Sequence, residues 1–166
     1  MRRELSNFGF GSGSAQLLSG FSSLHDELVN NLCKFTGMED GLIFSSGYLA
    51  NVGALQALIS RGDFVFHDRL NHASLIDGVL ASRAKHKRYP HLTIPNLQGY
   101  SGDSASKKFL VTESVFSMNG DHAPIRDLVS HCEKNDLVFY VDDAHGFGVI
   151  NGGVGAAAEF SPLASG

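Results

Sequence analysis

The sequence predicts an α/β fold in which helices cover both faces of a mainly parallel sheet, giving three layers (αβα). Short apolar runs bounded by Gly, Asp or Ser alternate with longer stretches in which apolar residues recur at helical spacing. This alternation is typical of βαβ units. The chain has 166 residues, 43% of them hydrophobic and 18% charged, which suffices for one domain with a sizeable core.

Individual elements follow from the same patterns. Four apolar runs predict strands, at residues 41–45, 64–67, 108–112 and 137–142. Three apolar stripes predict helices with one buried face. The stripes are Leu24, Leu28, Leu32 and Phe35; Leu49, Val52, Leu55 and Ile59; and Ile125, Leu128, Val129 and Cys132. A weaker helix is expected from Leu75, Val79 and Leu80, and mostly loop at residues 89–106.

Composition argues against several classes of partner. The formal net charge is -4 and the basic residues are scattered, so the sequence offers no basic face for nucleic acid. No apolar run approaches the roughly 20 residues of a membrane span, and the first residues lack the apolar core of a signal peptide. Cys33 and Cys132 lie among apolar residues, which predicts free buried thiols in a reducing compartment. We expect a cytoplasmic protein that binds neither nucleic acid nor membrane.

At Ser46-Gly47 an apolar strand is expected to pass into an apolar-periodic helix. Free backbone N–H groups and the positive end of a helix dipole can hold a phosphate at such a junction, with the Ser46 hydroxyl beside them. Tyr48 could stack on a flat ring. Ser46 equally suits an ordinary helix N-cap, so this segment alone leaves both interpretations open.

Two further segments place polar side chains after expected strands, where ligands bind in parallel sheets. His72 could lie flat on a planar cofactor or donate to a substrate, or it could simply cap the helix that follows. Residues 111–121 form a strand and a loop rich in hydroxyl and acidic side chains, including Glu113 and Ser117. These side chains could bond a ligand or satisfy the amides of turns.

The strongest signal is the apolar run 137–141, which delivers two acids and a histidine to its end. Buried acids need a cationic partner. Adjacent strand residues point to opposite faces, so Asp142 and Asp143 cannot face one ligand together, whereas Asp142 and His145 can share a site. A metal ion or a protonated ring nitrogen would satisfy Asp142. His67 and His72 are also metal-ligand types, which leaves a metallohydrolase open.

Five segments, in order, resemble the signatures of the α-oxoamine synthases. They are Gly11-Ser12-Gly13-Ser14, Ser45-Ser46-Gly47-Tyr48-Leu49-Ala50-Asn51, Asn71-His72-Ala73-Ser74, Thr112-Glu113-Ser114-Val115-Phe116-Ser117-Met118 and Val141-Asp142-Asp143-Ala144-His145-Gly146. That family has the aspartate-aminotransferase-type (fold type I) fold and uses pyridoxal 5'-phosphate (PLP) to join an amino acid to an acyl thioester with loss of carbon dioxide. The resemblance implies that residues 1–166 are part of the large domain of such an enzyme, which would be a homodimer.

The residues after Asp143, Ala144-His145-Gly146 followed by Phe147-Gly148-Val149, narrow the resemblance. They are most similar to family members that join L-alanine to a pimeloyl thioester, as CoA or carrier-protein ester, in biotin biosynthesis. Another member, such as a glycine C-acetyltransferase, and a non-catalytic remnant are the alternatives.

The resemblance also implies a role for each site residue. The amides of Gly47 and Tyr48, with Ser46 nearby, would hold the phosphate of PLP, and His72 would stack on its ring. Asp142 would keep the pyridine nitrogen protonated. His145 and Ser117 would bond the phenolic oxygen. His72, Asp142 and His145 are therefore the expected catalytic residues, with no metal; Glu113 is a further member of the site and Asp143 a structural residue.

The sequence departs from the family pattern in two respects. Gln16 stands where family members often carry Arg or His, and Val29 stands where they often carry Glu. No lysine lies in the Thr-x-Gly-Lys context that supplies the Schiff base and, in the family, removes the α-proton of the substrate. We therefore expect the amino-terminal segment, the lysine segment and the carboxyl-terminal small domain to be absent. The chain alone would then be inactive, with an exposed sheet edge prone to association.

Overall fold

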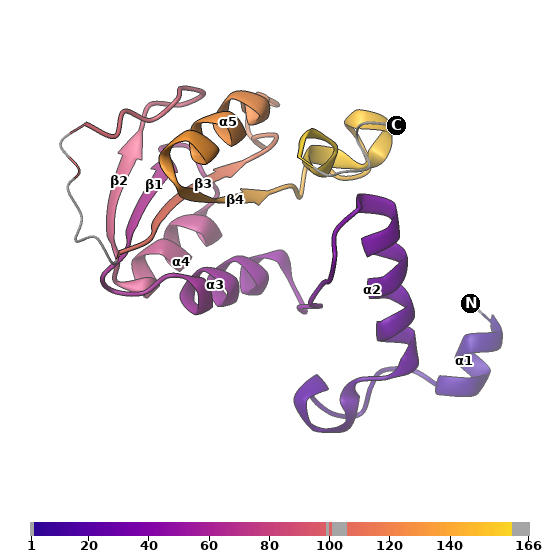
Figure 1. The fold of residues 1–166 in the computed structure, drawn as a ribbon. Helices are drawn as coiled ribbons and strands as arrows, with labels where there is room; N and C mark the ends of the chain where they lie inside the picture. Colours follow the sequence, from indigo (N-terminus) through magenta and orange to yellow (C-terminus); the bar gives the residue numbers. More distant parts are fainter. Residues whose placement is uncertain (1, 99, 101–105, 161–166) are drawn as a thin grey trace. The chain divides into compact units, whose positions relative to one another are not determined.

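The structure is a computed structural model that describes residues 2–98, 100 and 106–160. The chain divides into two compact units, Met1–Ile43 and Phe44–Gly166, and Figure 1 shows the elements of each. The assignment of residues 1–166 to part of one large domain stays a prediction. In the described ranges, no helix is both long enough and apolar enough to cross a bilayer.

The first unit consists of helices and connecting segments. It contains α1 (Arg2–Phe8), a π-helical turn (Gln16–Gly20) and α2 (Ser23–Thr36). A capping box between Ser22 and His25 starts α2, and Gly37 ends it with φ 74°, a left-handed conformation that suits glycine. The helix predicted from the apolar stripe is confirmed. Its expected buried face is wrong: Leu28, Leu32 and Phe35 are 49%, 40% and 49% exposed, because no described strand of this unit covers them.

The strand expected at residues 41–45 is also not formed. This segment has no regular structure, and the side chain of Leu42 is 84% exposed. An apolar run becomes a strand only where a neighbouring strand accepts and donates its backbone hydrogen bonds. In the described part of the chain, no strand pairs with it.

The second unit confirms the predicted α/β class. Its strands are β1 (Phe64–Asp68), β2 (Lys85–Tyr89), β3 (Lys108–Glu113) and β4 (Leu137–Asp142), all parallel, in the order β2-β1-β3-β4. Its helices are α3 (Gly47–Leu58), α4 (Ala73–Ser82) and α5 (Ile125–Asn135). In Figure 1, α3 and α4 lie on one side of the sheet and α5 on the other. Two short 3₁₀ turns, Asn151–Gly153 and Gly155–Glu159, follow β4.

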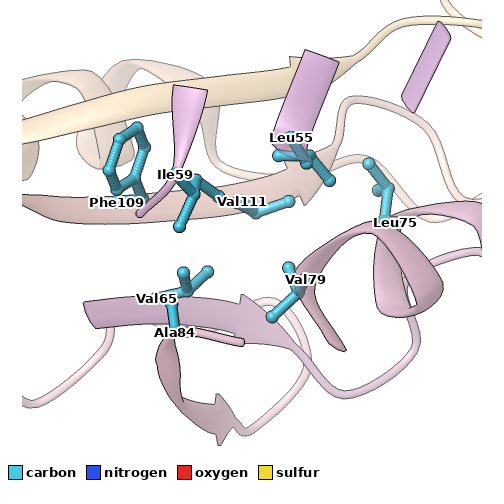
Figure 2. Packing of buried hydrophobic residues seen from close by; sticks show 8 residues of the cluster. All are labelled: Leu55, Ile59, Val65, Leu75, Val79, Ala84, Phe109 and Val111. Atoms are coloured by element: carbon cyan, nitrogen blue, oxygen red, sulfur yellow. The ribbon is translucent and has the colours of Figure 1, made fainter. Parts of the chain in front are cut away.

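Two hydrophobic clusters fill the space between these layers. Figure 2 shows the first, in which α3 and α4 meet the sheet. Its members are Leu55, Ile59, Val65, Leu75, Val79, Ala84, Phe109 and Val111. The second packs α5 on the opposite face, and its members are Phe66, Tyr89, Leu110, Leu128, Cys132 and Leu137. Alternate residues of β1 and β3 face opposite clusters, as the two-residue repeat of a strand requires. Cys132 is buried and Cys33 partly so, and both are free thiols.

Strand β2 was not predicted from the sequence. Its residues, Lys-His-Lys-Arg-Tyr, lack the apolar character of the other strands, and only Tyr89 is buried. It lies at one edge of the sheet, where charged side chains reach solvent and discourage further pairing. At the other edge of the described sheet lies β4, whose Val138 is 44% exposed.

The crossing of α3 and α4 depends on Gly78. A Cβ atom at this position would lie 2.8 Å from Leu55 Cδ1 and 3.1 Å from the backbone oxygen of Asn51. We expect Gly78→Val to lower the free energy of unfolding by about 1–3 kcal/mol through overpacking. Urea denaturation of this variant, compared with Ala81→Val on the exposed side of α4, measures the effect. Equal stability of the two variants would contradict the close packing.

Candidate functional site

The parallel register brings acidic side chains to one edge of the sheet. Strand β3 ends at Glu113 and β4 at Asp142, and these two residues are direct register partners. Strand β1 ends at Asp68 on the other side of β3. Because every strand runs in the same direction, these carboxyl ends and the loops that follow them form one edge, as the sequence predicted.

The start of α3 leaves backbone donors available beside this edge. The first intrahelical hydrogen bond runs from Ala50 N to Ser46 O (3.0 Å), and Leu49 N donates to Ser46 Oγ (3.2 Å). The amides of Gly47 and Tyr48 come before these bonds and have no intrahelical acceptor. Among the described residues, nothing lies within 4 Å of a Cβ placed on Gly47. Ser46 is thus an N-cap, and the two open amides can still donate hydrogen bonds to an anion.

Asn51 connects α3 to the end of β4. Its Nδ2 donates to Asp142 Oδ2 (2.6 Å) and to Ser74 Oγ of α4 (2.9 Å). Its Oδ1 accepts from the Tyr140 hydroxyl (2.9 Å). The side chain is 7% exposed, and its hydrogen bonds satisfy the polar atoms that burial removes from water. Asn51 therefore fixes one carboxylate oxygen of Asp142 relative to two helices.

The second oxygen of Asp142 is fixed by the loop that follows β4. Ala144 N donates to Asp142 Oδ1 at 3.0 Å. Asp143, by contrast, accepts from Ala156 N (2.8 Å) and from the Ser114 hydroxyl. The neighbouring carboxylates contact different elements, which agrees with their expected separation. Asp143 holds the turns after β4 in place, and a Cβ on Gly146 would collide with it.

His72 and Glu113 meet where α4 begins. His72 N donates to Glu113 Oε1 (2.5 Å), and His72 Nδ1 accepts from Ser74 N (3.2 Å) and contacts Ser74 Oγ (2.8 Å). His72 is thus the N-cap of α4, while its ring stays exposed. Burial raises the pKa of the Glu113 carboxyl, the His72 amide opposes this shift, and the charge of Asp142 adds to it.

His145 is the third residue that the sequence predicted to be catalytic, with His72 and Asp142. It is exposed in the turn after β4, and its charge and that of His72 both lower the pKa of Glu113. The charges of His72, Asp142 and His145 thus all act on Glu113, and the grouping of the three residues as a catalytic site stays a prediction.

Tyr48 and Ser117 are less closely integrated into the site. The Tyr48 hydroxyl donates to Asp77 Oδ2 of α4 (2.6 Å), and this hydrogen bond, with smaller contributions from burial and charge, raises the tyrosine pKa. Its ring is 46% exposed at the start of α3. Ser117 is exposed in the turn after β3. The stacking role of Tyr48 and the role of Ser117 stay predictions.

Sequence reasoning did not single out Asn51 or Ser74 as site residues. A signal for Asn51 does exist: it is a polar residue beside Val52 and Leu55 of an apolar stripe, and a buried amide must find partners. The partners themselves, on α4 and β4, are distant in sequence. His67, which the sequence offered as a metal-ligand type, contacts the edge strand β2: its Nε2 lies 3.2 Å from His86 Nδ1.

The arrangement suits an aromatic, cationic ring that carries a phosphate. A fixed carboxylate at Asp142 meets the charge of a protonated ring nitrogen, and the amides before α3 meet the phosphate. Two lysines of this unit lie at the opposite end of the sheet: Lys85 and Lys108 begin their strands, and Lys108 Nζ donates to Asn135 O (3.3 Å). In the part of the chain that the structure describes, no three metal-ligating side chains form a cluster.

Comparison with known proteins agrees with this fold. The model of the aminotransferase class I and II family matches residues 3–163. The chain therefore belongs to this family.

Particular relatives narrow the resemblance. The chain is 52% identical over 156 residues to the 8-amino-7-oxononanoate synthase of Azoarcus sp. (strain BH72), covering 93% of this chain and 40% of that protein. It is similar to a solved 8-amino-7-oxononanoate synthase from Francisella tularensis, at 33% identity and TM-score 0.72, covering 93% of this chain and 42% of the other. The chain thus spans about two fifths of the length of these relatives.

A variant of the serine palmitoyltransferase from S. paucimobilis was solved with a bound PLP–myriocin aldimine. It has 32% identity and TM-score 0.85 to this chain, covering 93% of this chain and 40% of the other. These comparisons confirm the fold type predicted from the sequence, and they also confirm the prediction of PLP as the cofactor.

Proposed function

We propose that this chain forms the cofactor-binding strand ends of a PLP-dependent acyltransferase of the 8-amino-7-oxononanoate synthase type. The whole enzyme would join L-alanine to a pimeloyl thioester with loss of carbon dioxide, in the cytoplasm and as a homodimer, for biotin biosynthesis. The identity to named synthases, 52% over 156 residues, supports the substrate class. The observation that carries the proposal is the Asp142 carboxylate, which Asn51 and the Ala144 amide hold at the end of β4.

Each residue of the site has a task in this proposal. PLP supplies an electron sink for the carbanion of the amino acid when it is bound. Asp142 holds a proton on the ring nitrogen, because a fixed carboxylate stabilises the cationic form. The amides of Gly47 and Tyr48, with Ser46, bind the phosphate, and His72 lies against the ring. His145 and Ser117 orient the phenolic oxygen.

A second member of the same enzyme class is the alternative. The serine palmitoyltransferase from S. paucimobilis has a TM-score of 0.85, above the 0.72 of the Francisella synthase. Its sequence identity of 32% is lower than the 52% of the Azoarcus synthase. We favour the synthase, because sequence differences between relatives record the chemistry of a pocket more directly than backbone similarity does.

Titration of the purified protein with PLP tests the cofactor assignment. We expect saturable binding followed by absorbance, and weaker binding of pyridoxal, which lacks the phosphate that the α3 amides hold. Borohydride treatment should leave no specific lysine adduct, since Lys85 and Lys108 begin their strands, at the end of the sheet opposite to Asp142. Equal affinity for pyridoxal would contradict the phosphate site. A stoichiometric adduct at one lysine would contradict the arrangement at Asp142, and absence of binding would favour a non-catalytic remnant.

A further inference from the structure

His91 joins two loops at the carboxyl edge of the sheet. Its Nδ1 lies 3.0 Å from Asp68 Oδ1, and its Nε2 lies 3.1 Å from Asp121 Oδ2. The side chain is 12% exposed. Both acceptors are carboxylates, so both ring nitrogens donate, and the imidazole that bridges them carries a positive charge.

One end of this bridge is rigid. Asp68 ends β1 and its side chain is 1% exposed. Besides His91, its carboxylate accepts from Leu70 N (2.8 Å) and Leu92 N (3.1 Å). A buried carboxylate with this many donors is expensive to move, because each lost donor would leave an unsatisfied oxygen.

The other end belongs to the loop that carries Ser117. Phe116 N donates to the Asp121 backbone oxygen (2.9 Å), and Gly120 N donates to Phe116 O (2.8 Å), so residues 116–121 form one closed turn. The Phe116 ring meets the His91 ring edge to face, with centroids 4.4 Å apart and planes at 86°. His91 thus contacts this loop through a charged hydrogen bond and through an aromatic contact.

Several charged groups act on this bridge. Burial by itself lowers the pKa of His91, but the hydrogen bonds to Asp68 and Asp121 outweigh it and raise the pKa above its ordinary value of 6.5. His91 lowers the pKa of Asp121 in return, and nearby His122 adds to that shift. On the rigid side, the charge of Asp68 acts on His67 and Tyr89.

We propose that His91 is a positioning residue, which holds the 116–121 loop, and with it Ser117, at the carboxyl edge for binding of PLP. The inference rests on the proposed function and assigns His91 no contact with the cofactor. Protonated His91 fixes the loop, and neutral His91 can donate to only one of its two carboxylates. The contribution to loop order is therefore complete below pH 6.5 and decreases as the pH rises through the raised pKa.

The experiment compares three single variants with the parent protein between pH 6 and pH 9. His91→Asn removes the bridge, and Asp121→Asn removes only its exposed end, in case the first variant folds poorly. His131→Asn makes the same change at a histidine of α5, outside the bridge, and serves as the matched control. Dissociation constants for PLP are measured by absorbance, and the ring nitrogens of His91 are followed by NMR without PLP.

We expect His91→Asn to weaken PLP binding by about tenfold at pH 6.5, since a loop ordered a tenth of the time reduces apparent affinity by that factor. The ratio of the PLP dissociation constant of His91→Asn to that of the parent should decrease toward high pH. A purely structural role of His91 would give a ratio that does not depend on pH. Asp121→Asn should lower the pKa of His91 in the NMR titration and weaken binding, and His131→Asn should leave binding unchanged.

The outcomes separate this inference from the proposed function. Failure of the parent protein to bind PLP overturns the proposed function. Normal binding by the parent, with the same affinity and pH profile in His91→Asn, overturns the positioning role alone. A His91 ring that is neutral at pH 6 also overturns it, because such a ring cannot donate to both carboxylates.

Discussion

Replacing Asp142 with Asn should weaken PLP binding about ten- to a hundredfold, the usual range for losing a hydrogen bond between charged groups. The variant keeps the shape of the side chain and removes its charge, so the ring nitrogen loses the partner that stabilises its proton. The absorbance spectrum of bound PLP should change in parallel, since ring protonation alters it. Titration with PLP at constant pH measures both effects.

Asp143→Asn is the matched control for this prediction. It makes the same change at the adjacent residue, whose carboxylate contacts Ala156 N and Ser114 instead of the predicted cofactor side. This control should lose stability, because it weakens the bonds to the turns after β4, and should bind PLP with nearly the parental affinity. If the two variants lost PLP affinity equally, the assignment of Asp142 as the ring partner would be wrong.

Most of the sheet could be predicted because its central strands are fully buried. Phe64–Asp68 and Lys108–Glu113 each have neighbours on both sides, and each contains a run of three apolar residues, Phe-Val-Phe and Phe-Leu-Val. The edge strand Lys85–Tyr89 could not be predicted in this way. Four of its five side chains are exposed to solvent, so it carries polar residues and no apolar run. Residues 41–45 have the apolar content of a strand but lack a described partner, which no local pattern can reveal.

The candidate site could be predicted only where one segment carries several signals. Asp142 and His145 come after the apolar run 137–141, and the general rule for parallel sheets places them at the ligand edge. For Ser46 and His72, the sequence left capping and ligand binding as alternatives. In the structure both residues are helix N-caps. The amides after Ser46 and the ring of His72 remain accessible, so capping does not exclude a ligand. His91 could not be found from sequence, because Asp68 and Asp121 meet it only after folding.

Asn51→Leu should lower the free energy of unfolding by about 2–4 kcal/mol, because it leaves buried partners of one amide without a hydrogen bond. Asn51 bonds Asp142 and Tyr140 of β4 and Ser74 of α4. Leucine fills a similar volume, so the loss reports hydrogen bonding and not a cavity. Chemical denaturation gives the stability. PLP titration should show weaker binding as well, since the Asp142 carboxylate loses the donor that orients it.

Gln56→Leu provides the control for Asn51→Leu on the same helix. It makes the same change from amide to leucine at an exposed position, where the side chain bonds only within α3. This control should retain parental stability and PLP affinity. If Asn51→Leu lost stability but kept full PLP affinity, the Ala144 amide alone would suffice to orient Asp142, and Asn51 would be a packing residue. If both properties decline together, one buried amide couples the packing of α3 on α4 to the position of the carboxylate at the end of β4.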